Sequence, residues 1–198
     1  MESTFFGKNK TLLIILAVVV IIALYGVGTY NSFISLEQNV DSKWSDVENQ
    51  YQRQADLIPN LVSVVSSSVK VETNFVKDVT DARTKWQNSK TLFDRDLAGA
   101  QMNNGITALV NAIATSENYP VLQANKQYIA LTDEISGTQN RIAVARGRYI
   151  EAIQSYNTAI KRFPGNLFAK VFGFSGKDYY KAELNSLKNP SLGTGVLP

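Results

Sequence analysis

The sequence contains no cysteine and no histidine. Without cysteine the chain can form no disulfide, no thiolate nucleophile and no cysteine-based zinc or iron–sulfur site. Without histidine it lacks the commonest general base and the commonest ligand of transition metals. Catalysis would depend on Asp, Glu, Lys, Ser or Tyr alone, so the composition favours a protein that is not an enzyme and needs no cofactor.

Net charge is also small, because the formal value is only +3 over 198 residues. The charge is unevenly distributed: positions 135–188 hold nine Lys or Arg against three acids, whereas positions 30–134 hold nine against thirteen. The last third is therefore a basic segment on an acidic domain. No motif that reads a nucleic-acid groove accompanies the basic residues, so we expect no nucleic-acid partner.

The longest apolar run is "LLIILAVVVIIALYGV", from Leu12 to Val27. As a helix this run is about 24 Å long, at about 1.5 Å per residue. The run has 16 residues, slightly fewer than the roughly 20 that span a bilayer. Tyr25 and Tyr30, however, suit the aromatic belt at a membrane interface. We expect residues 11–29 to form a transmembrane anchor. A cleaved signal peptide that ends at "GVG" is the alternative.

Two lysines, Lys8 and Lys10, precede the apolar run, and mixed charges follow it. By the positive-inside rule residues 1–10 then lie in the cytoplasm. The expected location is the cytoplasmic (inner) membrane of a bacterium, crossed once, with the C-terminal domain in the periplasm or outside the cell.

Apolar residues recur at alternating spacings of three and four after the anchor, which is typical of helices that pack along a seam. Regular series run from Phe33 to Ile58, from Leu61 to Trp86 and from Tyr128 to Ile160, and a weaker one covers Leu92 to Thr115. The last helix is expected to begin at Pro120 and to end at "KRFPGN". No segment is typical of a strand. The expected fold is all-α, with an antiparallel up-and-down four-helix bundle after the anchor.

A proline interrupts the first seam within "DLIPNL", which comprises Asp56, Leu57, Ile58, Pro59, Asn60 and Leu61. Inside a helix, proline removes one hydrogen bond and costs about 3 kcal/mol, whereas in a first turn it is tolerated. We therefore favour a helix break here, with Asp56 as the N-cap of a second helix. The alternative is one continuous helix kinked at Pro59, which would give three long helices.

Two polar residues, Gln139 and Arg146, lie on the seam of the last helix. The arginine either extends to the edge of the bundle or forms a buried pair, because a buried unpaired charge is very costly. The candidate partners, from a neighbouring helix, are Asp46, Glu48 and Asp56. Either arrangement would be structural and would fix the register of the helices.

Other acids occur as neighbours in sequence: Asp46 with Glu48, Asp94 with Asp96, and Asp133 with Glu134. Residues one or two apart on a helix do not share a face. We therefore interpret these acids as solvated surface charges and expect neither a catalytic nor a metal site.

Several motifs together identify a resemblance: "DLIPNLV" near position 59, "VTDAR" (Val79–Arg83), "NRIAVAR" and "YNTAI" within Ser116–Ile160, and "FPGNLFAKVFGF" (Phe163–Phe174). In this order they resemble the LemA family of bacterial membrane-anchored proteins, and with the N-terminal span they cover nearly the whole chain. Two positions depart from the family pattern, Gln139 for Glu and Ile150 for Asn, so any buried charge network would be smaller here. The resemblance implies a tethered four-helix bundle without assigned catalytic activity, and a membrane metalloprotease as one conceivable partner.

The segment after the bundle interleaves aromatic and basic side chains, namely Phe168, Lys170, Phe172, Phe174, Lys177, Tyr179 and Tyr180. Such side chains can cap an open end of the bundle, or they can contact lipid headgroups or a partner. The expected boundaries are a helical bundle over 30–162, a basic aromatic tail over 163–188 and a flexible end over 189–198.

These features predict a non-enzymatic scaffold of the cell envelope that associates with itself and with the bilayer. The alternatives are a protein that acts on lipid surfaces or remodels membranes through its tail, and an adaptor of a membrane metalloprotease.

Overall fold

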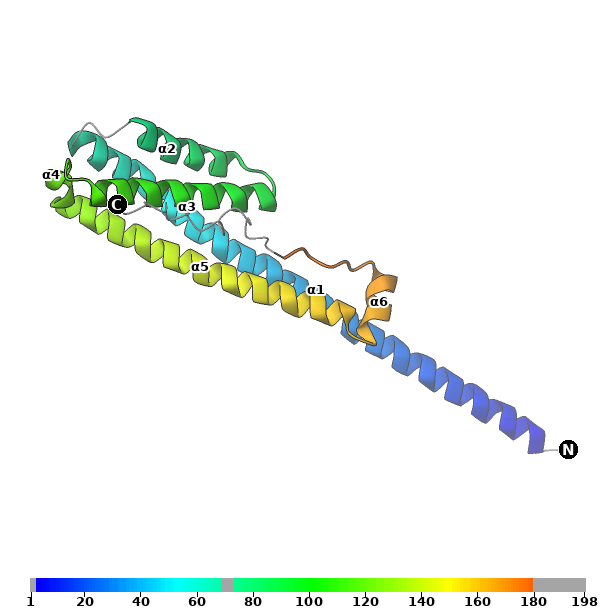
Figure 1. Cartoon of the computed structure of the whole chain (residues 1–198). Helices are drawn as coiled ribbons and strands as arrows, with labels where there is room; N and C mark the ends of the chain where they lie inside the picture. Colours follow the sequence, from blue (N-terminus) through cyan, green and yellow to red (C-terminus); the bar gives the residue numbers. More distant parts are fainter. Residues whose placement is uncertain (1–2, 69–72, 180–198) are drawn as a thin grey trace, which may run out of the picture. The chain divides into compact units, whose positions relative to one another are not determined.

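The structure is a computed structural model that describes residues 3–68 and 73–179, with side chains described for residues 10–67 and 76–179. These residues form helices and loops, and no strand occurs among them. The helices are α1 (Ser3–Ser68), α2 (Thr73–Asn88), α3 (Leu92–Thr115), α4 (Pro120–Gln123), α5 (Lys126–Lys161) and α6 (Gly165–Phe172). The prediction of an all-α fold is confirmed (Figure 1).

The chain divides into two compact units. The middle unit is residues 42–148, and the terminal unit combines the described residues of the first 41 positions with those from 149 onward. Helices α1 and α5 each contribute to both units. Each unit has a core of its own and is described separately.

The middle unit contains the end of α1, then α2 and α3, and the start of α5. Figure 1 shows that α2 and α3 lie side by side and run in opposite directions. Its buried side chains include many that the helical spacing predicts, among them Val47, Tyr51, Ile58, Val79 and Trp86. Gly99 lets α3 approach α1 closely, because a Cβ at this position would lie 2.6 Å from the ring of Tyr51.

Helix α1 runs through Pro59 without a break, so the predicted helix end at this proline is wrong. Asp56 is therefore inside the helix, where it accepts a hydrogen bond from Gln52 instead of acting as an N-cap. Proline has no N–H, so the carbonyl of Ala55 loses its intrahelical donor. Arg83 on α2 replaces the missing donor, because its Nε–H donates a hydrogen bond to that carbonyl oxygen at 2.9 Å.

The expected start of the second helix, after Asp56, is wrong as well: α1 continues to Ser68 and α2 begins at Thr73. The remaining helix boundaries are closer to those predicted. Helix α3 covers the expected range, and the hydroxyl of Thr91 caps it by accepting a hydrogen bond from the N–H of Asp94. Pro120 begins only the single turn α4, and the long helix α5 begins later, at Lys126. The side chain of Asn125 explains this start, because it accepts hydrogen bonds from the first N–H groups of α5.

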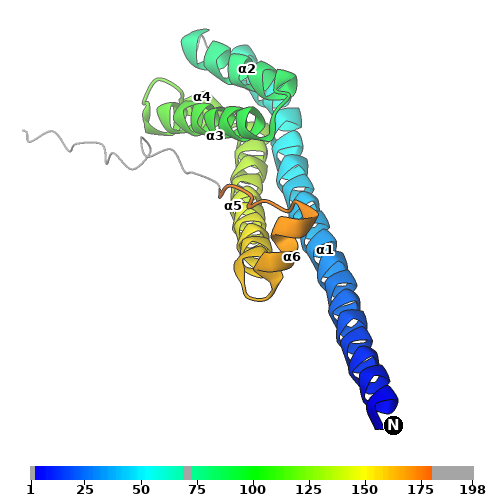
Figure 2. The ribbon, with the colours of Figure 1, turned by 90° about the vertical axis from the view of Figure 1, so that its right-hand side faces the viewer.

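In the terminal unit, the stretch of α1 before Ser42 packs against the second half of α5 and against α6. Figure 2 shows α6 alongside α1. Its buried core consists of Phe33, Val40, Ala152, Ile153, Tyr156, Ile160 and Ala169. Residues 12–27 of α1 lie outside this core, and nearly all of their side chains are exposed. Among the helices that the structure describes, α1 alone is long and apolar enough to cross a membrane.

Candidate functional site

A buried ion pair joins α3 to α5 in the middle unit. The Nη2 and Nε atoms of Arg146 both donate hydrogen bonds to Oδ1 of Asp96, at 2.7 and 3.2 Å. The guanidinium also lies over the ring of Tyr51 on α1, 5.5 Å from its centroid. Only 7% of Asp96 is exposed. Its burial raises the pKa of its carboxyl group, although the charge and hydrogen bonds of Arg146 act in the opposite direction.

The acids that the sequence suggests for Arg146 have other partners. Asp46 lies 3.5 Å from Lys43, Glu48 pairs with Arg95 at 2.7 Å, and Asp56 binds Gln52. The interpretation of Asp96 as a solvated surface charge is wrong, because α3 turns this residue toward the core on the same face as Gly99. The weak apolar pattern of α3 conceals which of its faces is buried.

Gln139, the second polar residue on the predicted seam, also contacts α3. Its Nε2 donates to the hydroxyl of Thr107 at 3.1 Å. A further amide contact joins α1 to α3, because Nε2 of the buried Gln54 donates to Asn103 at 3.0 Å. Gln139 on α5 and Gln54 on α1 therefore each join α3 to another helix.

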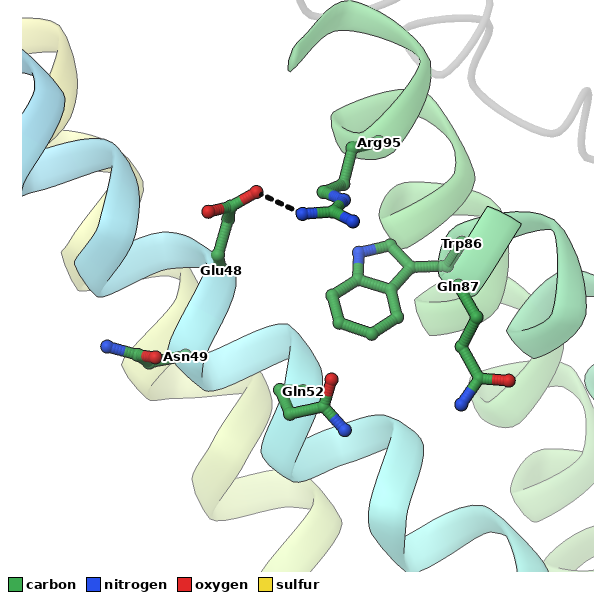
Figure 3. A pocket seen from close by; sticks show the side chains of 6 residues that line it. All are labelled: Glu48, Asn49, Gln52, Trp86, Gln87 and Arg95. Atoms are coloured by element: carbon green, nitrogen blue, oxygen red, sulfur yellow. Dashed lines mark hydrogen bonds and ion pairs between the residues drawn. The ribbon is translucent and has the colours of Figure 1, made fainter. Parts of the chain in front are cut away.

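A shallow pocket of about 230 Å³ opens where α1, α2 and α3 meet (Figure 3). It is lined by Glu48, Asn49, Gln52, Trp86, Gln87 and Arg95. Arg95 is paired with Glu48 and lies over the Trp86 ring, 5.6 Å from its centroid. The pocket is smaller than the roughly 300–1,000 Å³ typical of small-molecule sites, and both of its charged groups already pair with each other. In the part of the chain whose side chains are described, no cluster of acids could hold a metal ion.

The aromatic residues of the tail pack on α1 in the terminal unit. Phe168 lies against Tyr25, with ring centroids 5.5 Å apart, and Phe172 against Tyr30, at 5.2 Å. Phe174 contacts Tyr30 and also Phe33, at 5.6 and 5.2 Å. These contacts attach α6 and the residues after it to the end of the apolar run.

A set of hydrogen bonds, which we call the tail latch, holds residues 175–177 on α5. The buried side chain of Asn157 makes two of them: its Nδ2 donates to the carbonyl of Lys177 at 2.8 Å, and its Oδ1 accepts from the N–H of Lys177 at 2.9 Å. The hydroxyl of Tyr156 donates to the carbonyl of Ser175 at 3.0 Å. The latch has no signal in the sequence, because its partners on the tail are backbone atoms.

The side chain of Lys177, predicted as a membrane or partner contact, has partners inside the protein. Its Nζ lies 3.3 Å from Glu37 and 3.4 Å from Asp41, both on α1. Burial alone would lower the pKa of Lys177, but these carboxylates outweigh it and raise the pKa above its ordinary value. Of the other predicted contacts, Lys170 and Tyr179 are exposed, and Tyr180 lies outside the described residues.

Replacing Asn157 by alanine is expected to open the tail latch. The variant loses two hydrogen bonds, each with a net value of about 1 kcal/mol, so the closed tail should lose about 1–2 kcal/mol. Hydrogen exchange of the Lys177 amide should become about 5- to 30-fold faster. The exposed neighbour Thr158→Ala is the control and should leave this exchange rate unchanged. Equal exchange in the Asn157→Ala variant and the wild type would contradict the role of the latch.

Comparison with known proteins supports the resemblance found from the motifs. The profile of the LemA family matches residues 43–192. Magnetosome protein MamQ 2 of Paramagnetospirillum magneticum is 26% identical to this chain over 176 residues, which cover 77% of this chain and 64% of that protein. Magnetosome protein MamQ of Magnetospirillum gryphiswaldense is 25% identical over 175 residues, which cover 76% and 64%. The chain thus spans slightly less than two thirds of the length of these relatives. Because the family profile matches most of its residues, the chain belongs to the LemA family.

Proposed function

We propose that the protein is a single-pass, membrane-anchored scaffold of the bacterial envelope that associates with itself through its helical domain. The observation that carries the proposal is the composition of α1. Its residues 12–27 expose apolar side chains, and further along the same helix Phe33, Val47 and Ile58 are buried in protein cores. One uninterrupted helix is therefore both the anchor and a core element, which suits a protein that holds a domain at a membrane.

The proposed location is the cytoplasmic membrane. Lys8 and Lys10 favour a cytoplasmic N-terminus, and the helical domain then lies in the periplasm or outside the cell. The bundle in this proposal covers residues 30–162.

The polar interior of the protein supports a structural role. The buried pair of Arg146 and Asp96 connects α3 to α5, and the tail latch connects the tail to α5. These groups are used to fix helices and the tail in place, as expected of a rigid assembly unit. The relatives are magnetosome proteins by name, and we propose by analogy that this protein too works as part of a larger assembly.

Self-association is tested with two differently tagged full-length copies expressed together. Anchoring confines the copies to two dimensions and raises their effective concentration, so we expect one tag to retrieve the other from detergent-free lipid nanodiscs. Mass measurement of the discs should then give more than one copy. An unrelated single-pass protein at the same expression level is the control.

A mass that corresponds to one copy, with no second protein, would exclude the scaffold. Retrieval of a membrane metalloprotease together with a single copy would instead favour an adaptor function.

A further inference from the structure

A groove of about 570 Å³ lies in the terminal unit, between residues 25–33 of α1 and the turn from α5 to α6. Its volume is within the range of about 300–1,000 Å³ that is typical of small-molecule sites. Tyr25, Phe33 and Phe163 supply aromatic walls. Thr29, Ser32 and Arg162 supply two hydroxyls and one positive charge. The groove therefore combines an apolar wall with groups that bind phosphate.

The groove lies where the apolar run of α1 ends. If Lys10 lies at one membrane interface, a hydrocarbon layer crossed by about 20 helical residues ends near position 30. Helix α6 is held at the same level, because Phe168 packs on Tyr25 and on Gly26, where a Cβ would be only 3.0 Å from its ring. This step rests on the membrane anchoring proposed above.

A neighbouring face of α6 is apolar and uncovered. Leu167 and Val171, four residues apart and therefore on one face, are 54% and 79% exposed. Phe163, just before the helix, is 74% exposed. A short helix with one face on protein and an exposed apolar face at this level suits the boundary between headgroups and acyl chains.

Residues 161–172, which we call the corner, carry positive charges that form no ion pair among the described residues. Lys161, Arg162 and Lys170 are exposed, and residues 161–172 include no acid. Among the residues that the structure describes, none of these three cations has an ion-pair partner, whereas Lys177 nearby is paired with Glu37 and Asp41. Lys161 and Arg162 also line a neighbouring hollow of about 310 Å³. Anionic headgroups are the complement to such a surface.

We propose that this corner binds an anionic phospholipid of the membrane that α1 spans. Arg162, with Thr29 and Ser32, receives the phosphate, and the acyl chain lies along the aromatic wall of the groove. Leu167 and Val171 insert beside the bound lipid.

The test uses full-length protein in vesicles of phosphatidylcholine with 30% phosphatidylglycerol. Because the chain has no cysteine, Leu167→Cys can carry one environment-sensitive fluorophore. Its quenching by spin-labelled phosphatidylglycerol is compared with quenching by spin-labelled phosphatidylcholine at equal density. We expect the anionic lipid to quench two- to fivefold more strongly. Arg162→Gln should bring this ratio close to one, and Arg148→Gln, which removes an exposed charge elsewhere on α5, should leave it unchanged.

Equal quenching by the two lipids in the wild type would overturn the proposal, as would an equal loss of selectivity in both variants. A shielded fluorophore that neither lipid quenches would show that protein covers the corner, and would also overturn it. Extraction of the vesicles with alkaline carbonate separates this failure from failure of the anchor: a protein that remains in the membrane without lipid selectivity contradicts only the lipid site.

Discussion

Replacing Arg146 by methionine is expected to lower the free energy of unfolding of the middle unit by about 3–5 kcal/mol, the usual cost of breaking a buried ion pair. The loss arises because the carboxyl group of Asp96, almost fully buried, would lose the positive charge of Arg146 and the two hydrogen bonds from it. Urea unfolding of the full-length protein in nanodiscs, followed by fluorescence, measures it. Both tryptophans, Trp44 and Trp86, are buried in the middle unit and report on its unfolding.

The loss in the Arg146→Met variant should depend on pH. Burial already raises the pKa of Asp96, and removing the nearby positive charge should raise it further. A carboxyl group with a raised folded-state pKa destabilises the protein above that pKa, and the effect disappears as pH falls toward the unfolded-state value of about 4. The cost is therefore expected to be largest near neutral pH and to shrink on acidification.

Two controls separate the buried pair from general effects of the substitution. Arg141→Met removes a more exposed arginine that lies 3.0 Å from Glu134, and should cost less than about 1 kcal/mol. Adding Asp96→Leu to Arg146→Met removes the stranded charge and should recover most of the lost stability. A loss in Arg146→Met no larger than that in Arg141→Met would show that the pair is not structural.

Replacing Arg83 by leucine is expected to cost about 1.5–3 kcal/mol, the range for a hydrogen bond with a charged donor. The Nε–H of Arg83 is the donor that the structure assigns to the carbonyl of Ala55, which Pro59 leaves without an intrahelical partner. Without it, a carbonyl in the core of the middle unit loses its hydrogen bond. The same urea unfolding experiment measures the change, and the exposed Lys85→Leu on α2 should stay within about 0.5 kcal/mol of the wild type.

A second substitution tests the link between Arg83 and Pro59. In Pro59→Ala the new N–H can donate to Ala55, so the carbonyl no longer depends on the arginine. Arg83→Leu should then cost at least about 1 kcal/mol less than it does in the wild type, which is a coupling that a double-mutant cycle measures. Equal costs in the two backgrounds would mean that Arg83 acts through other contacts.

The helical spacing predicts the cores of both units well, because α1 and α5 have regular apolar stripes. Phe33, Val47 and Tyr51 on α1, and Ile142 and Ile153 on α5, are all buried as expected. This pattern depends only on local repeats within one helix. It therefore predicts which faces are buried, but it does not reveal the contacts between helices.

The predictions that are wrong concern contacts between segments, which a local pattern does not reveal. The break at Pro59 follows from local propensity, but a side chain from α2 replaces the lost donor and the helix continues. Asp96 is on α3, whose small residues and glycines give no clear apolar stripe, so its burial has no local signal. The tail latch depends on backbone groups of Ser175 and Lys177, which any residue type could supply.

The terminal unit also has a consequence for the order in which the protein is made. Its first stretch ends at Asp41 and its second begins at Tyr149. Roughly a hundred residues separate them, which the ribosome adds in about 5–20 s at about 5–20 residues per second. During that interval Tyr30 and Phe33 have no aromatic partners from the tail. The part of α1 around Tyr30 and Phe33 is thus synthesised well before the aromatic residues that cover it. A chain that stops before α6 would leave these two side chains without those partners.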